Sequence, residues 1–181
     1  MAAFLAASGV ALVSMACRFT SGEKYSGVEA AMADTARHLD ELRPRALALV
    51  DLDAGSYDAV SAAYALPRAG EEQKSARAAA IQRALKGALE VPFHTMQLAL
   101  AGLELAAPVA ASLNPNLASD CGVGARCLAT AVESAFANVR INAASIKDES
   151  YVRERLTASE QLRARARELQ QRVQDAVDSL A

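Results

Sequence analysis

The N-terminal segment is the most uniformly apolar part of the chain, and residues 1–17 carry no charged side chain. Small residues recur at nearly every turn of a helix drawn through this segment: Ala3, Ala6, Ala7, Gly9, Ala11 and Ser14. Small side chains on several faces let neighbouring helices approach from more than one side. We therefore expect residues 2–18 to form a central helix.

A longer periodic segment covers about residues 27–66. Spacings of three and four predict one helical stripe, made of Leu39, Leu42, Ala46, Leu49, Val50, Asp53, Tyr57 and Val60. Pro44 is expected to kink this helix or to begin a new one, because proline lacks the backbone N–H that a helix interior uses. Residues 67–70, which hold a proline and a glycine, are expected to end the segment.

The next helix is predicted to begin at Glu71 and Glu72, whose charges suit a first helical turn, and to run to about residue 89. Pro92 is expected to begin another helical segment, and residues 93–113 are nearly uncharged. Residues 114–120 are the most loop-like stretch, so Ser119 or Asp120 is expected to cap a helix over residues 121–142.

Residues 148–180 predict an amphipathic surface helix with one apolar stripe, formed by Leu162, Leu169, Val173, Val177 and Leu180. No segment alternates with the period of two that a strand requires, and no linker or repeat separates the segments. The sequence therefore predicts an all-α, single-domain bundle of five to six helices over residues 1–181.

Composition supports helices and excludes several classes of protein. Of 181 residues 43 are Ala, 4% are aromatic, and the net charge is −2, so a basic nucleic-acid-binding surface is not expected. Cys17, Cys121 and Cys127 lack the spacing of a disulfide framework or a metal site, which favours a reducing cytoplasm. The uncharged start resembles the apolar part of a secretion signal, but the first cation, Arg18, follows it instead of preceding it. It is also short and weakly apolar for a membrane span.

Candidate chemistry rests on a few polar residues. His38 lies among charged residues and is expected to be solvated, and His94 follows Phe93 in an apolar run and is expected to be packed or locally bonded. Asp53 falls on the predicted apolar stripe, where a buried carboxylate requires a partner or a task; a surface carboxylate is the alternative. Asn138 and Asn142 share a helical face, and asparagine in a helix interior suggests hydrogen bonding to a partner or ligand.

Taken in order, these stretches resemble the family of formiminotetrahydrofolate cyclodeaminases and methenyltetrahydrofolate cyclohydrolases. The resemblance covers roughly residues 5–155. Its most specific pieces are Asn114-x-Asn116-x-x-Ser119-Asp120-x-Gly122-Val123 and Asn138-Val139-x-Ile141-Asn142 followed by Asp148. The others are Arg18-Phe19-Thr20 before a loop with Lys24 and Tyr25, Asp53-x-x-Ser56-Tyr57, Leu66-Pro67, Ile81-Gln82 and Val91-Pro92.

The resemblance implies an all-α, homodimeric, cytoplasmic enzyme of folate one-carbon metabolism. Both family reactions need a carboxylate that stabilises a cation and a nearby proton-transfer group, and neither needs a metal or a redox cofactor. Asp53 and Asp120 are the candidates for cation stabilisation or base work, and Lys24 is the candidate proton donor or ligand anchor.

The same resemblance suggests the groups that hold the substrate. Asn116, Asn138 and Asn142 would orient the pterin or the attacking water, with Ser119 beside them, and Arg18 or Arg140 would bind the glutamate carboxylate as a fork. The alternatives are a turn and helix cap for Asn116, Ser119 and Asp120, a solvated cation for Arg140 and a loop cation for Lys24.

The sequence departs from this family in two places. Family members commonly open with a Pro-Gly-Gly-Gly turn before the first helix, whereas this sequence begins within that helix. The loop after Thr20 is one residue shorter than usual and carries Lys24 as its single cation. A non-catalytic helical scaffold or folate-binding relic is therefore the alternative function.

Overall fold

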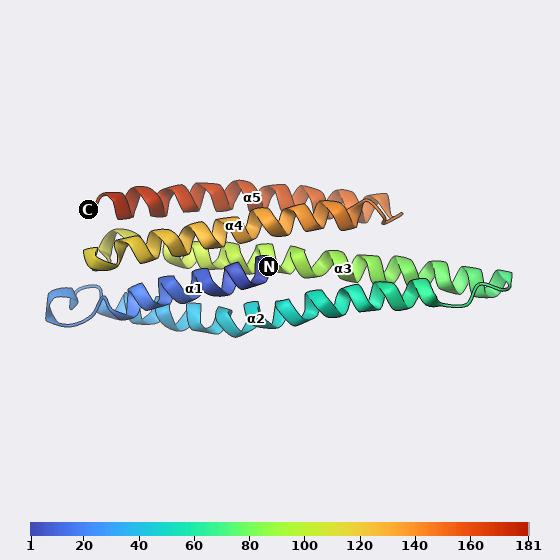
Figure 1. Cartoon of the computed structure of the whole chain (residues 1–181). Coiled ribbons are helices and arrows are strands. Elements are labelled where there is room, and N and C mark those ends of the chain that lie inside the picture. Colours follow the sequence, from blue (N-terminus) through green and yellow to red (C-terminus); the bar gives the residue numbers. More distant parts are fainter. Residues whose placement is uncertain (181) are drawn as a thin grey trace.

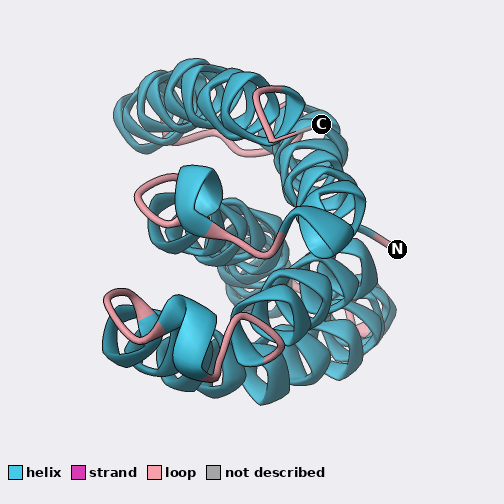
Figure 2. Cartoon of the chain, turned by 90° about the vertical axis from the view of Figure 1, so that its left-hand side faces the viewer, coloured by secondary structure: helices cyan, strands magenta, loops and turns pink. Residues whose placement is uncertain are grey.

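Helix α1 (Ala2–Arg18) lies between α2 (Glu29–Ala65) and α4 (Ala118–Ala143) in the computed structural model, which describes residues 1–180. Helix α3 (Glu71–Ala106) packs against α2 and α4, and α5 (Glu149–Asp178) covers α3 and α4 (Figure 1). Short 3-10 turns occupy Glu23–Tyr25, Ala110–Ser112 and Pro115–Leu117. Seen from one end, residues 1–180 form only helices and loops (Figure 2), so the predicted all-α bundle with a central first helix is confirmed.

The helices differ in length, and this difference positions the candidate site. Helix α1 has 17 residues, whereas α2 has 37 and α3 has 36. The N-terminus of α1 therefore lies partway along the bundle, and α2 and α3 continue past it as a long hairpin (Figure 1). None of the described helices is long and apolar enough to cross a membrane.

Helices α1 and α4 approach each other at two glycines. A Cβ atom built on Gly9 would lie 2.8 Å from the carbonyl oxygen of Gly124, and one built on Gly124 would lie 2.9 Å from the side chain of Val13. Neither position has room for a larger residue, because these neighbours include backbone and packed core side chains. The small residues of the first segment thus allow the close helix contact that their pattern predicted.

The prolines do not divide the helices as predicted. Helix α2 continues through Pro44 and α3 continues through Pro92. A proline removes one backbone hydrogen bond from a helix interior, and packing of the helix on either side can offset that loss. Buried Leu39, Leu42 and Ala46 flank Pro44, and Leu89 and Phe93 flank Pro92, so both helices are held to the core around their prolines.

The predicted cap of α4 is also wrong. Helix α4 begins at Ala118, so Ser119 and Asp120 lie within its first turn, and no side chain caps it. Asn114 instead closes the preceding turn, where its side chain accepts a hydrogen bond from the amide of Asn116 at 3.1 Å. The backbone amide of Asn114 donates to Thr20 Oγ1 at 3.0 Å, and this bond ties the loop to the end of α1.

The second half of α2 is exposed, contrary to the predicted stripe. Leu39, Leu42, Ala46 and Leu49 are buried, but Val50 and Tyr57 are 37% and 73% exposed and Asp53 is exposed. The amphipathic pattern continues past the point where α1 begins. Because α1 does not cover this part of α2, most side chains beyond residue 50 remain on the surface, and Ala63 is the buried exception.

Candidate active site

A small polar hollow lies where α1 begins. It has a volume of about 140 Å³ and is enclosed by the first residues of α1 together with α2, α3 and α4. Its lining includes Asp53 from α2, Thr95 from α3 and Asn138 from α4, among Leu49, Val50 and Pro92. Two residues that the sequence singled out separately, Asp53 and Asn138, are thus brought together.

The side chains of Asp53 and Asn138 make no hydrogen bond or ion pair with residues 1–180, although the carbonyl of Asp53 accepts a bond from Ser56 at 2.8 Å. Thr95 Oγ1 donates to the carbonyl of Val91 at 3.0 Å, so its hydrogen is used locally. The hollow therefore offers one carboxylate and one amide to a ligand, set against apolar walls. Such a pair can face a cationic carbon and orient a water molecule beside it.

A second group of candidates lies at the opposite end of α1. Arg18 donates from Nη2 to Asp40 Oδ2, and it lines a hollow of about 260 Å³ with Thr20, Ser21 and Glu29. Lys24 lies in the following loop, exposed, with Nζ 5.3 Å from the centre of the Tyr25 ring. At roughly 1.5 Å per residue, the ends of this 17-residue helix are about 24 Å apart.

The motif at the start of α4 belongs to this second end. Asn116 is exposed and Asp120 is half-buried in the first turn of α4. Ser119 faces α5, where it lines a hollow of about 290 Å³ with Gly122, Arg126 and Gln174. The chain therefore does not gather all the candidate residues into a single cavity.

The other two candidates on α4, Asn142 and Arg140, make different contacts, and neither lines the hollow. Asn142 Nδ2 donates to the carbonyl of Ala88 at 2.8 Å, so it joins α4 to α3. Arg140 is exposed, with its guanidinium 6.0 Å from the centre of the Phe136 ring. Asn138 and Asn142 share one face of α4, as their spacing predicted, and this face lies toward α3. Of the two, only Asn138 lines the hollow.

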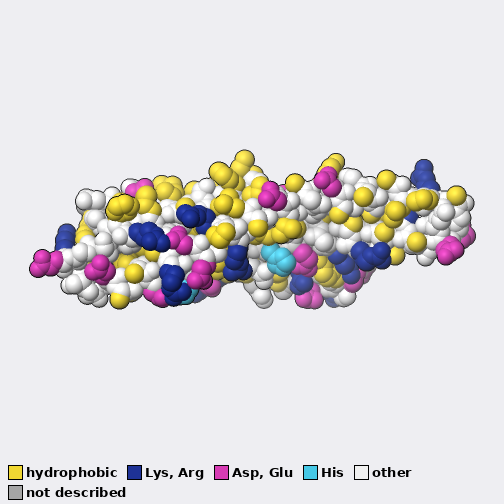
Figure 3. All heavy atoms as spheres, turned by 90° about the horizontal axis from the view of Figure 1, so that it is seen from below, with side chains coloured by type: hydrophobic (Ala, Val, Ile, Leu, Met, Phe, Trp, Pro, Cys, Tyr) yellow, Lys and Arg dark blue, Asp and Glu magenta, His cyan; other side chains and the backbone are white. Residues whose placement is uncertain are grey.

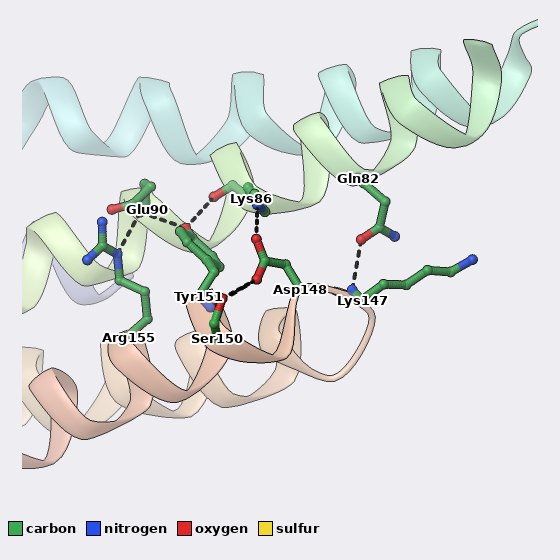
Figure 4. A network of polar contacts seen from close by, with 8 residues as sticks. All are labelled: Gln82, Lys86, Glu90, Lys147, Asp148, Ser150, Tyr151 and Arg155. Carbon is green, nitrogen blue, oxygen red and sulfur yellow. Dashed lines mark hydrogen bonds and ion pairs between the residues drawn. The ribbon is translucent and has the colours of Figure 1, made fainter. Parts of the chain in front are cut away.

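Two further motif residues have a structural use that the sequence did not reveal. Gln82 of α3 donates to the carbonyl of Ser145 at 3.2 Å and accepts from the amide of Lys147 at 2.8 Å. Asp148 caps α5 by accepting from the amide of Tyr151 at 3.1 Å, and Lys86 Nζ donates to its other oxygen at 2.7 Å (Figure 4). Both residues hold the loop between α4 and α5 against α3.

The same region contains a partly buried network that joins α3 to α5. Tyr151 donates to Glu90 Oε1 at 2.6 Å, and Arg155 Nε donates to the same oxygen at 2.7 Å (Figure 4). Burial raises the pKa of Glu90, but these two hydrogen bonds outweigh that effect and leave the pKa lowered. Burial, with the neighbouring Glu90 carboxylate, raises the pKa of Tyr151 to about 12.

These shifts predict how stability depends on pH. The raised pKa means that the protonated phenol of Tyr151 is favoured in the folded protein, and this stabilises the fold while the pH is below about 10, the ordinary tyrosine value. The contribution is lost as the pH rises from about 10 to about 12. We expect the melting temperature of the wild type to fall more steeply over this range than that of Tyr151→Phe. Tyr25→Phe, at a tyrosine outside this network and outside α5, should keep the wild-type slope. Parallel slopes for all three proteins would contradict the assignment.

The hydrogen bond from Lys86 to Asp148, with those from Ser150 and the amide of Tyr151, holds the pKa of Asp148 far below its usual range. That carboxylate therefore contributes to stability above about pH 4, and the contribution is lost as the pH falls below this value.

Two of the cysteines and both histidines are either buried or paired with a carboxylate. Burial raises the pKa of Cys17 to about 11. Burial and the nearby Cys17 raise the pKa of Cys121 to about 12, so both thiols stay protonated at neutral pH. His38 and His94 each lie beside a carboxylate of the preceding turn, 3.4 Å from Asp34 and 3.8 Å from Glu90. Residues 1–180 contain no group of three or more His, Cys, Asp or Glu placed to hold a metal ion.

The fold and the hollows define an all-helical protein with candidate ligand-binding groups near both ends of its central helix. The chain belongs to the formiminotransferase-cyclodeaminase family, whose sequence model matches residues 1–161. It is 38% identical to the methenyltetrahydrofolate cyclohydrolase of Methylorubrum extorquens over 98% of this chain and 86% of that protein.

Two other relatives extend the comparison. The pig formimidoyltransferase-cyclodeaminase is 32% identical over 87% of this chain, which corresponds to 30% of the pig enzyme's length. The crystal structure of formiminotetrahydrofolate cyclodeaminase from Thermotoga maritima superposes with a TM-score of 0.86 at 26% identity, over 98% of this chain and 85% of that one. The family resemblance seen in the motifs is therefore confirmed.

Proposed function

We propose that the chain is a methenyltetrahydrofolate cyclohydrolase, which converts 5,10-methenyltetrahydrofolate and water to 10-formyltetrahydrofolate. The observation that carries this proposal is the pairing of Asp53 and Asn138 in one hollow at the start of α1. The similarity to the Methylorubrum enzyme over nearly the whole chain supports the choice of reaction. No metal or redox cofactor takes part in the proposed reaction.

The substrate carries a positive charge that is spread over N5, the bridging carbon and N10. In the proposed reaction Asp53 stabilises this cation and accepts a proton from the attacking water, while the Asn138 amide orients that water. A C–O bond forms at the bridging carbon, the bond from that carbon to N5 breaks, and N5 takes up a proton. The formyl group stays on N10, and one proton is released overall.

The groups at the other end of α1 are proposed to serve the rest of the substrate. Arg18 binds a glutamate carboxylate as a fork, and Lys24 anchors an anionic group or donates a proton. Asp120 and Asn116 stand beside them at the start of α4 as supporting polar groups. Arg140 and Asn142 have weaker support, because Arg140 lies outside the hollow and Asn142 is bonded to Ala88.

The direct test adds the protein to 5,10-methenyltetrahydrofolate and follows the loss of its absorbance against the spontaneous rate. A rate well above the protein-free control, with 10-formyltetrahydrofolate as product, supports the proposal. The similarity to the Thermotoga cyclodeaminase makes formiminotetrahydrofolate the second substrate to offer, with ammonia release as its readout. Folate binding without acceleration of either reaction would instead identify a non-catalytic member of the family.

We further propose that the chain is a cytoplasmic homodimer, joined through the exposed half of α2. Of the eleven large, exposed apolar side chains, five lie there and a sixth, Leu66, directly follows the helix; the five are Leu47, Val50, Leu52, Tyr57 and Tyr64. With α2 toward the viewer, Figure 3 shows apolar side chains exposed along the length of this face between charged ones. Exposed apolar surface of this extent is typical of a protein interface. The three free cysteines are consistent with the reducing cytoplasm.

The proposed interface borders the hollow, because Val50 lines the hollow and is also one of these exposed side chains. Tyr57→Glu is then expected to convert the dimer to a monomer in sedimentation and to lower activity with it. Gln161→Glu, which adds the same negative charge at an exposed position of α5, should leave the dimer intact. A wild-type protein that sediments as a monomer would contradict this proposal.

A further inference from the structure

Arg18 is held by a carboxylate that is itself anchored in the core. The Ser14 side chain is only 3% exposed, and its hydroxyl donates to Asp40 Oδ1 at 2.8 Å. Arg18 Nη2 donates to the other oxygen, Oδ2. Both oxygens of Asp40 are therefore engaged from α1, one by a buried hydroxyl and one by the arginine.

This arrangement restricts an otherwise mobile side chain. Arg18 is 59% exposed, whereas Asp40 is 28% exposed. An exposed arginine loses much rotamer freedom when it binds a ligand, and a fixed partner reduces that loss because part of the freedom is already gone. The hydrogen bond from Arg18 outweighs burial and lowers the pKa of Asp40, with help from Ser14 and from the charge of nearby Arg43. Asp40 therefore stays ionised at neutral pH.

The arginine keeps donors available for a ligand. Of its nitrogens, only Nη2 bonds to a side chain or backbone group within residues 1–180. Arg18 also lines the hollow of about 260 Å³ at the end of α1. Glu29, the carboxylate across that hollow, accepts a bond from the amide of Gly22 at 3.4 Å. The guanidinium is thus the cationic group of this hollow and has a free edge for a carboxylate.

We propose that Asp40, anchored by Ser14, is a positioning residue that orients Arg18 to bind the glutamate carboxylate of the folate substrate. This inference rests on the proposed function, and it adds a residue that no sequence motif contained. Asp40 acts through Arg18 and does not touch the reacting atoms. Its loss therefore changes substrate binding and leaves the chemical step unchanged.

The test compares two substrates, 5,10-methenyltetrahydrofolate and 5,10-methenyltetrahydropteroate, which lacks the glutamate. Asp40→Asn is expected to raise KM for the folate about tenfold, the size of one charge-assisted hydrogen bond, with kcat unchanged. The same variant should leave kcat/KM for the pteroate at the wild-type value. Arg18→Ala should behave in the same way, and the double variant should show no larger effect than Arg18→Ala alone.

Matched variants separate positioning from general stability. Asp34→Asn removes an exposed carboxylate that pairs with Arg37 at 2.5 Å on the same helix, and it should match the wild type on both substrates. Asp40→Glu, which restores a carboxylate, should recover most of the affinity. Ser14→Ala, which removes only the anchor, should raise KM for the folate about threefold, roughly the effect of one weakened hydrogen bond.

The outcomes distinguish this inference from the proposed function. An active wild type whose Asp40→Asn variant loses affinity equally for both substrates, or for neither, overturns the positioning role alone. A wild type that accelerates neither substrate overturns both the proposed function and this inference.

Discussion

Asp53→Asn is expected to lower kcat for 5,10-methenyltetrahydrofolate at least tenfold, because a positioned proton-transfer group typically contributes about 10²- to 10⁴-fold. Asparagine keeps the size and polarity of the side chain but removes its negative charge. The variant therefore loses both stabilisation of the cationic substrate and the acceptor for the water proton. Because Asp53 is exposed and forms no ion pair with residues 1–180, its replacement should not unfold the protein.

The matched control is Asp51→Asn, which removes an exposed carboxylate two residues away on the same helix but outside the hollow. It has the same effect on net charge and should retain full activity. Circular dichroism and melting temperature should be unchanged in both variants. Wild-type kinetics for Asp53→Asn would remove Asp53 from the active site and leave Asn138 without a catalytic partner.

Gly9→Val is expected to destabilise the fold by about 3 kcal/mol, the upper part of the range for overpacking a core. The new side chain would have to enter the contact between α1 and α4, where even a Cβ atom lies 2.8 Å from the Gly124 carbonyl and 2.6 Å from Leu128 Cγ. A carbonyl oxygen in a helix cannot move aside as a flexible side chain can. The two helices must therefore separate along their length.

Urea unfolding monitored by circular dichroism measures this loss. Gly87→Val is the matched control, because Gly87 lies inside α3 and a Cβ atom there meets nothing within 4 Å. It should be neutral to slightly stabilising, since a glycine in a helix interior costs about 1 kcal/mol relative to alanine. Equal stability of Gly9→Val and the wild type would show that α1 and α4 do not pack as closely as described.

Local patterns predicted most of the helices well, but they did not predict that two helices continue through their prolines. The start of α3 followed from its acidic first turn, and that of α5 followed from the onset of an amphipathic pattern near residue 148; both signals depend only on nearby residues. Pro92 was expected to begin a new helical segment, and Pro44 was expected to kink its helix or begin a new one, yet α2 and α3 each continue as one helix. Contacts with neighbouring helices decide whether a proline ends a helix, and a single sequence does not contain them.

The candidate site shows the same division between local and tertiary information. Asp53 and Asn138 were identified separately as polar residues in apolar patterns, and they line the same hollow although they are 85 positions apart in the chain. Gln82, Asn142 and Asp148 appeared in the same set of motifs, but they bind the loop or the neighbouring helix. A motif records which residues occur and does not distinguish a ligand-binding group from one that holds two helices together.

The sequence by itself determined the helical class, the approximate helices and the family of this protein, because residue periodicity, alanine content and ordered motifs are properties of the chain alone. The tertiary structure decided where α1 begins along the bundle, and with it the hollow beside Asp53 and the exposed half of α2. It also placed Asp40 between Ser14 and Arg18. The physical reason is that cavities and charge pairs depend on distances between helices, and packing of side chains from distant parts of the chain sets those distances.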